Sequence, residues 1–228
     1  MNTMSKLIIP TVRTFLLGAI VLGVLLFLPA WTLDYWQAWV FIVVFMTSVN
    51  AIGVYLSLKD PALLERRKKG GPAAERNEVQ KIIISIAITS FLGLFVFCGF
   101  DHRFGWSPVP AYVSLAGDAL VALGLFIDLI VFRENSFGGS TIETFEGQKV
   151  ISTGPYALVR HPMYVGVLVM GIGVPLALGS WWGLAYLTLM LPVLVLRILD
   201  EEQLLKNDLP GYREYVQQVR YRLVPYLW

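Results

Sequence analysis

The hydrophobic positions of the 228-residue chain fall into long apolar runs separated by short polar stretches. Most runs reach the ~20 residues that a helix needs to cross the apolar core of a bilayer. The pattern therefore predicts an all-α integral membrane protein, a bundle of about five to six transmembrane helices. The predicted segments lie at residues 11–33, 36–58, 81–100, 110–132, 162–179 and 181–199.

The last two apolar segments are short and share a tight turn at Gly179-Ser180-Trp181-Trp182. They form either a hairpin of two full spans or one that does not quite cross. We predict a single membrane domain, 1–228, in which spans one to four occupy residues 1–132. Residues 133–228 then carry a cofactor-binding and catalytic region.

A tail that is too polar to span a membrane follows the last apolar segment. Pro210-Gly211 breaks the chain, and apolar side chains then recur at helical spacing in Tyr212, Tyr215, Val216 and Val219. This spacing predicts an amphipathic C-terminal helix on the cytoplasmic side, lying on the membrane or over the mouth of the site.

Composition agrees with a membrane protein and excludes several other classes. The chain is 56% hydrophobic and 15% charged, whereas soluble domains carry about 25% charged residues. Its one cysteine, Cys98, provides no disulfide framework, and its two histidines stand apart, so no metal site is expected. No phosphate-binding loop and no basic face are present, so nucleic acid is not expected as a partner. No obligatory protein partner is evident either.

The distribution of charge orients the predicted spans. With a cytoplasmic N-terminus, all of the 18 lysines and arginines except Arg103 fall on the cytoplasmic side. Both termini and the polar motifs of the C-terminal half would then face the cytoplasm. The basic loop at Glu65–Lys69 is most simply a topogenic signal that touches anionic headgroups.

The first polar motif runs from Gly154-Pro155-Tyr156 to Arg160-His161-Pro162-Met163-Tyr164 and leads directly into an apolar helix. Pro162 suits the first turn of that helix, which places His161 near the N-cap. The free N–H groups of the helix start, together with Arg160, would form a seat for a carboxylate. The alternative is ordinary helix-start chemistry with a snorkelling arginine.

The second polar motif, Asp200-Glu201-Glu202, is predicted to close the last apolar helix. Three acids at a helix C-terminus oppose the helix dipole, so something should offset their cost. Ion pairs with Arg160, Arg197 or Arg222 would do so, and so would a bound cation or a ribose diol. These explanations are compatible.

Three further polar residues lie in or after the fourth segment. Asp118 and Asp128 are about 15 Å apart along the predicted helix and on different faces, so they do not form a catalytic pair. Each either satisfies a buried partner or faces a polar pocket. Asn135 opens a polar loop that could hold an adenine by hydrogen bonds and stacking.

These motifs, in this order and spacing, resemble those of the isoprenylcysteine carboxyl methyltransferases and their relatives, the membrane phospholipid N-methyltransferases. The resemblance covers residues 135–225. Asp60-Pro61-Ala62-Leu63-Leu64-Glu65-Arg66 and Phe104-Gly105-Trp106-Ser107 look like the bacterial members, which implies the bacterial inner membrane. The C-terminal residues that carry the resemblance are Glu201-Glu202, Pro210-Gly211-Tyr212, Tyr215, Arg222 and Pro225.

The resemblance implies S-adenosyl-L-methionine as cofactor and a cytoplasmic active site. The implied catalytic residues are Arg160, His161, Glu202 and Arg222, of which Glu202 and Arg222 would shape the acceptor site. Glu201 would be a partner of the ribose or sulfonium, and Tyr212 and Tyr215 would pack a lid. The implied cofactor-binding residues are Asn135, Tyr156, Ala157, Leu158, Val159, Arg160, His161, Tyr164, Glu201, Tyr212 and Tyr215.

We therefore expect methyl transfer to a lipid-like or small amphiphilic acceptor, most simply carboxyl O-methylation, because few residues could act as a base for an amine. Phospholipid N-methylation and S-methylation are the alternatives within this class. In another class, an NADPH-dependent sterol-type membrane reductase uses a similar Arg-His-Pro segment, but only Lys149 adds a cation for the 2′-phosphate. A non-catalytic membrane binding protein is the third possibility.

Overall fold

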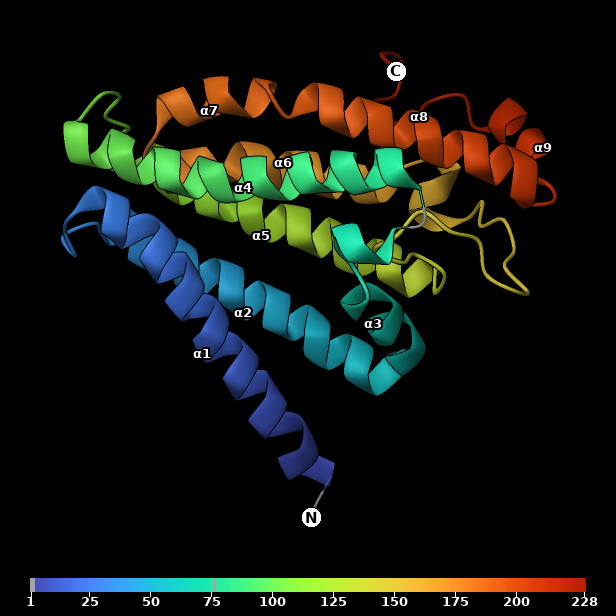
Figure 1. Cartoon of the computed structure of the whole chain (residues 1–228), viewed down its shortest axis with the longest axis horizontal. Coiled ribbons are helices and arrows are strands. Elements are labelled where there is room, and N and C mark those ends of the chain that lie inside the picture. The colour runs from blue at the N-terminus through green and yellow to red at the C-terminus, as the bar shows by residue number, and fades with distance from the viewer. Residues whose placement is uncertain (1–2, 76) are drawn as a thin grey trace.

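The computed structural model describes residues 3–75 and 77–228, and Arg76 lies outside the described residues. The described chain is all helical, which confirms the predicted fold class (Figure 1). Its elements are α1 (Thr3–Ala30), α2 (Trp36–Lys59), α3 (Pro61–Lys68), η1 (Pro72–Ala74), α4 (Glu78–Phe104), α5 (Ala111–Glu134), η2 (Gly154–Ala157), α6 (Pro162–Ala177), α7 (Trp181–Thr188), α8 (Leu191–Asp208) and α9 (Tyr212–Gln218).

Five helical stretches within the described residues are long and apolar enough to span a membrane. The sixth helix, α6, has 16 residues and is therefore roughly 24 Å long, shorter than the ~30 Å apolar core of a bilayer. The protein is thus an integral, multi-pass membrane protein, and the number of long apolar helices agrees with the predicted five to six. The five stretches are Ile9–Ala30, Trp36–Lys59, Glu78–Phe104, Ala111–Glu134 and Trp181–Asp208, the last formed by α7 and α8 together.

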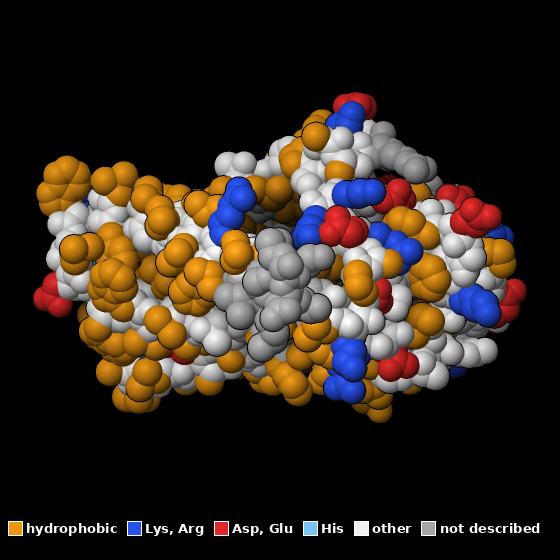
Figure 2. Space-filling model, turned by 90° about the horizontal axis from the view of Figure 1, so that it is seen from below, with side chains coloured by type: hydrophobic (Ala, Val, Ile, Leu, Met, Phe, Trp, Pro, Cys, Tyr) orange, Lys and Arg blue, Asp and Glu red, His pale blue; other side chains and the backbone are white. Residues whose placement is uncertain are grey.

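Helices α4, α5, α6 and the α7–α8 stretch run alongside one another, α1 and α2 slant away from them, and α3, η2 and α9 lie toward one end of the bundle (Figure 1). On the face shown in Figure 2, hydrophobic side chains cover the opposite part of the molecule, and charged side chains concentrate toward this end. This division matches a lipid-embedded body with one polar end. That the polar end faces the cytoplasm stays a prediction from the charge distribution.

Glycines bring α5 and α6 into closer contact than any larger residue would permit. A Cβ atom on Gly117 would lie 2.2 Å from the backbone nitrogen of Ala177, and one on Gly124 would lie 2.5 Å from the carbonyl oxygen of Gly166. Small residues of this kind are the usual means by which helices pack in a membrane, where no hydrophobic force drives them together. The contact fixes the start of α6 against the C-terminal half of α5, and it thereby positions the polar motif that precedes α6.

At the other end of the bundle, a buried cluster around Asp101 fixes the turn between α6 and α7. The Asp101 carboxylate accepts hydrogen bonds from the Ser107 amide (2.9 Å) and from the hydroxyls of Ser107 and Ser180. The Ser107 hydroxyl oxygen in turn accepts from the Trp181 amide at 3.0 Å. All the buried polar groups of this cluster are paired, so we assign it a structural role.

We expect Gly117→Ala to destabilise the protein by about 1–3 kcal/mol, because the added methyl group meets backbone that has no room to move. Gly53→Ala is the matched control, since a Cβ there has nothing within 4 Å. That control should be neutral or stabilise the helix by about 0.5 kcal/mol. Unfolding in detergent, followed by circular dichroism, measures both, and equal stability of the two variants would contradict the close α5–α6 contact.

Candidate active site

A polar cavity lies at the end of the bundle where α5, α6, α8 and α9 meet. It encloses about 100 Å³ and is closed on one side by the irregular loop between α5 and η2. Eight of the cofactor-binding residues implied by the resemblance line it, together with residues from the loop and apolar side chains of α8. The eight are Asn135, Tyr156, Arg160, His161, Tyr164, Glu201, Tyr212 and Tyr215.

The segment before α6 is held by the tail. The amides of Arg160 and His161 donate to the carbonyl oxygens of Tyr221 and Arg222, at 2.9 and 3.0 Å. His161 is the N-cap of α6 and Pro162 occupies its first turn, as the sequence predicted. The tail therefore forms part of the site although it follows the motif by about 60 residues.

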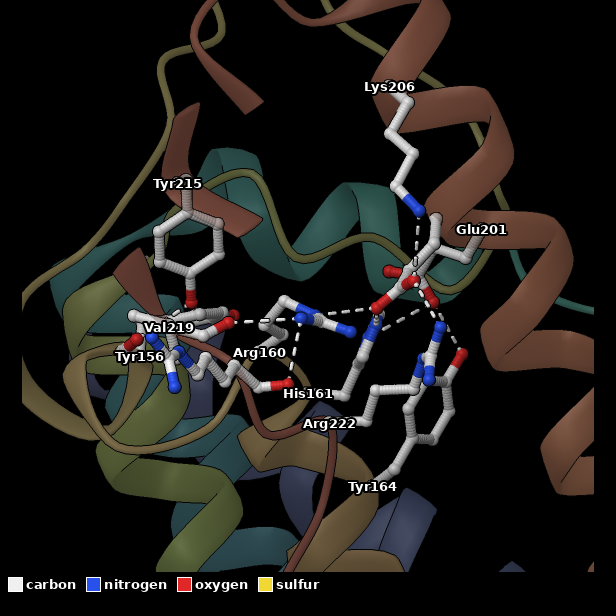
Figure 3. Close-up of polar contacts among 11 residues, drawn as sticks. Tyr156, Arg160, His161, Tyr164, Glu201, Lys206, Tyr215, Val219 and Arg222 are labelled. Carbon is white, nitrogen blue, oxygen red and sulfur yellow. Dashed lines mark hydrogen bonds and ion pairs between the residues drawn. The ribbon is translucent and has the colours of Figure 1, made fainter. Parts of the chain in front are cut away.

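Glu202 is the electrostatic centre of the site, because the side chains of four labelled residues in Figure 3 converge on it: Arg160, His161, Lys206 and Arg222. Its carboxylate is buried, and oxygen Oε1 lies 2.7 Å from Nε of Arg160 and 3.4 Å from Nε2 of His161. Oxygen Oε2 lies 3.2 Å from Nη2 of Arg222 and 3.4 Å from Nζ of Lys206. A buried carboxylate needs such partners, because an unpaired charge at this depth would cost several kcal/mol.

Most of the hydrogen-bonding capacity of Arg160 is used inside the protein. Besides its contact with Glu202, Nη1 donates to the carbonyl oxygens of Val219 and Arg220, both at 3.0 Å. Arg160 therefore ties α8 to the tail, and its charge is neutralised by Glu202. A ligand carboxylate bound at the start of α6, as expected from the sequence, would therefore have to accept hydrogen bonds from other donors of the cavity.

The prediction that Asp200-Glu201-Glu202 closes a helix is wrong, because α8 continues to Asp208. The three acids lie inside the helix, where the dipole argument does not apply, and each has its own partner. Asp200 accepts from Nε2 of Gln80 at 2.6 Å, and Glu201 accepts from the hydroxyl of Tyr164 at 2.8 Å. Of the three acids, Glu201 alone lines the cavity.

Tyrosine hydroxyls provide donors to the cavity. The hydroxyl oxygen of Tyr156 accepts from Nδ2 of Asn135 at 2.9 Å, and burial raises the pKa of Tyr156 to about 12, so it keeps its own proton at neutral pH. Burial and the nearby carboxylates also raise the pKa of Tyr212. The Tyr212 hydroxyl is buried and has no hydrogen-bond partner among the described residues. The hydroxyl of Tyr215 donates to the carbonyl oxygen of Tyr156 at 2.7 Å and closes the wall.

Several residues named from the sequence are not in the lining of this cavity. The amides of Leu158 and Val159 donate to the Pro155 carbonyl oxygen, and Leu158 faces solvent. Ala157 lies outside the lining as well, so only Tyr156 of this stretch reaches the cavity. Glu202 and Arg222 instead line a separate groove, and Asp118 and Asp128 are buried within α5.

Sequence reasoning missed three arginines that hold the loop between α5 and η2. Nη1 of Arg66 donates to the Ser136 carbonyl at 2.6 Å, and Nη1 of Arg67 donates to the Gly138 carbonyl at 3.1 Å. Nη2 of Arg197, in α8, donates to the Ser140 carbonyl at 2.9 Å. The basic stretch Glu65–Lys69, treated above as a topogenic signal, thus also holds a wall of the candidate site through Arg66 and Arg67.

Arg67→Ala should loosen this loop, because it removes a partly buried guanidinium that bonds two carbonyl oxygens, those of Gly138 and Gly139. Losing a charge-assisted hydrogen bond costs about 1.5–3 kcal/mol, so we expect amide exchange in residues 136–145 to accelerate at least about tenfold. Hydrogen–deuterium exchange with mass spectrometry measures this. Arg133→Ala, at an exposed position of α5, is the control, and equal exchange in both variants would contradict the role of Arg67.

Two comparisons with known proteins match part of the chain. The sequence model of the phospholipid methyltransferase family matches residues 112–209. That match includes Asn135, the motif that leads into α6, and the acids of α8, and it stops before α9. The Delta(14)-sterol reductase of Mus musculus is 33% identical over 94 residues, which cover 40% of this chain and 22% of the reductase. The chain therefore spans about a fifth of that relative's length.

Proposed function

We propose that this protein is an integral membrane methyltransferase that uses S-adenosyl-L-methionine. The observation that carries the proposal is a carboxylate, Glu201, held by the Tyr164 hydroxyl in a cavity walled by aromatic rings. A sulfonium cation is stabilised by a carboxylate and by aromatic faces. The match of the phospholipid methyltransferase family across this region supports the same class.

The donors and acceptors of the cavity fit the cofactor. The unpartnered Tyr212 hydroxyl and the proton of Tyr156 are donors for the carboxylate or ribose of an amino-acid nucleoside. Glu201 can accept from a ribose diol, and Phe137 adds an aromatic surface near Asn135 for an adenine. Lys149 lines the cavity and adds a cation that a cofactor carboxylate could approach.

The cavity must enlarge to admit such a ligand, since about 100 Å³ is below the several hundred Å³ of ordinary ligand pockets. The loop between α5 and η2 is the wall that could move, because hydrogen bonds from arginine side chains hold it rather than secondary structure. The tail could not open as easily, because Arg160 and Glu202 fix it at a buried site.

When bound, the cofactor supplies an electrophilic methyl group on a sulfonium. The protein's contribution is positioning and electrostatics, which can account for most of the acceleration of such a displacement. Glu201 and Tyr164 fix the charge environment on one side, and the buried Arg160–Glu202 pair keeps the tail in place as a water-excluding wall. The imidazole ring of His161 lies against the carboxylate of Glu202, so His161 is not free to act as a base.

An apolar cavity of about 340 Å³ between α4, α6 and the α7–α8 stretch supports a lipid-like acceptor. Tyr164 lines both this cavity and the cofactor cavity, so an apolar chain held there would end beside the reacting centre. Because His161 is engaged, a carboxylate or thiolate acceptor, which needs no base, is favoured over an amine. Carboxyl O-methylation is therefore our first proposal, with phospholipid N-methylation or S-methylation as alternatives.

A membrane reductase that uses NADPH is the second candidate, because the mouse sterol reductase aligns with part of the chain. The charges of the cavity disfavour it. Arg160 is neutralised by Glu202, which leaves Lys149 as the one unneutralised lysine or arginine among the described lining residues, and Glu201 adds a carboxylate to the same lining. NADPH brings several phosphate charges, and such a cavity compensates them poorly.

Calorimetry on the detergent-purified protein should show binding of S-adenosyl-L-methionine and none of NADPH. Glu201→Gln, which keeps an acceptor for Tyr164 but removes the charge, should weaken that binding at least about tenfold, or 1.4 kcal/mol. Asp200→Asn is the matched control, because this neighbouring acid bonds Gln80 and lies outside the cavity lining.

Arg160→Ala should also weaken binding of S-adenosyl-L-methionine at least about tenfold, because Glu202 would lose its closest partner and the tail its anchor. The same calorimetric titration measures it. Binding of NADPH alone to the unmodified protein would overturn the proposal and assign the same cavity to a reductase. Equal losses in Glu201→Gln and Asp200→Asn would refute the assignment of Glu201.

A further inference from the structure

An open groove of about 600 Å³ lies beside Glu202, between the last turns of α8, α9 and the tail. It shares no lining residue with the cofactor cavity. Three cations line it, Lys206, Arg213 and Arg222, and they face one carboxylate, that of Glu202. The groove therefore carries more positive than negative charge.

The geometry of these cations leaves donors for a further anion. Lys206 and Arg222 both approach the same oxygen of Glu202, at 3.4 and 3.2 Å. Nε of Arg222 is buried and has no hydrogen-bond partner among the described residues, which is an unfavourable state for a donor. Nε of Arg213 donates to the Lys206 carbonyl at 3.0 Å, which holds its side chain against α8. An anion with several oxygens would satisfy this set.

The groove is continuous with an exposed apolar face of α8. Leu196, Leu199, Gln203 and Lys206 recur at a spacing that puts them on one side of a helix. The two leucines are 53% and 43% exposed, and they precede the cation along the helix. An apolar strip that ends in a cationic groove at the polar end of the bundle is shaped for an amphiphile with an anionic head.

We propose that this groove binds the anionic headgroup of a bilayer lipid, with an acyl chain of that lipid along Leu196 and Leu199. The site is separate from the cofactor cavity and does not depend on the proposed methyl transfer. Glu202 links it to that cavity. An anion bound to Lys206 and Arg222 competes with oxygen Oε2 of Glu202 for these two cations and leaves Glu202 paired with Arg160 and His161, which line the cavity.

The test is lipid retention by the full-length protein. We would reconstitute it in phosphatidylcholine vesicles that contain phosphatidic acid, release it with mild detergent and count retained lipid by native mass spectrometry. A cation near an anionic headgroup is worth about fivefold in binding. We expect Lys206→Gln/Arg213→Gln to retain roughly 25-fold less phosphatidic acid and Arg213→Gln alone about fivefold less. Phosphatidylcholine retention should not change in either variant.

Arg133→Gln is the control, since this exposed cation lies at the same end of the bundle but outside the groove. Equal retention in Arg133→Gln and the double variant would overturn the proposal, because it would reduce the effect to general surface charge. Inorganic phosphate at millimolar concentration should not displace the lipid. Full displacement would assign the groove to a soluble anion instead and likewise overturn it. The single exposed substitution Arg213→Gln remains informative if the double variant does not fold.

Discussion

The polar end of the molecule depends on the ion pairs that the buried carboxylate of Glu202 forms. It joins α8, which carries it, to the segment before α6 through Arg160 and His161, and to the tail through Arg222. These three parts are distant in sequence and share no secondary structure. A buried charge is costly unless every partner is present. The carboxylate of Glu202 therefore holds the tail in place, because moving the tail away would leave this buried charge without some of its partners.

Two kinds of packing set the position of this centre. The glycine contact between α5 and α6 is apolar and rigid, and it fixes where α6 begins. The loop between α5 and η2 is held differently, by arginine side chains that bond backbone carbonyls. Rigid helices thus carry the charged residues, while the wall that admits a ligand consists of contacts that can be exchanged individually. This division suits a site in which the charged residues must be placed accurately while one wall opens to admit a ligand.

The sequence predicted the apolar helices well because length and hydropathy directly report the requirement for crossing a bilayer. It also predicted that the motif at Arg160 and the acids of α8 belong together, since ionisable groups near a membrane need partners. It placed the end of α8 wrongly because hydropathy falls at Asp200 whereas the helix does not end there. Helix-forming residues such as Gln203, Leu204 and Lys206 continue it outside the apolar layer.

The roles of Arg66, Arg67 and Arg197 could not be predicted in the same way. Their partners are backbone carbonyls about 60 to 70 residues away in sequence, and a carbonyl carries no signature in the amino-acid code. Likewise, nothing local distinguishes Arg160, whose donors bind the tail, from an arginine whose donors face a ligand. Only the fold shows which donors are already used.

The pairing of Arg160 and His161 with Tyr221 and Arg222 also has a consequence for biosynthesis. Chains fold from the N-terminus as they are made, so α1 to α6 can enter the membrane while Glu202 and its last partner are still unmade. Until residues 219–222 emerge, Arg160 lacks two carbonyl partners and the pocket has no closed wall. The polar end of the bundle can therefore reach its closed arrangement only after residues 219–222 have been made, and the preceding helices alone would leave Arg160 without these partners.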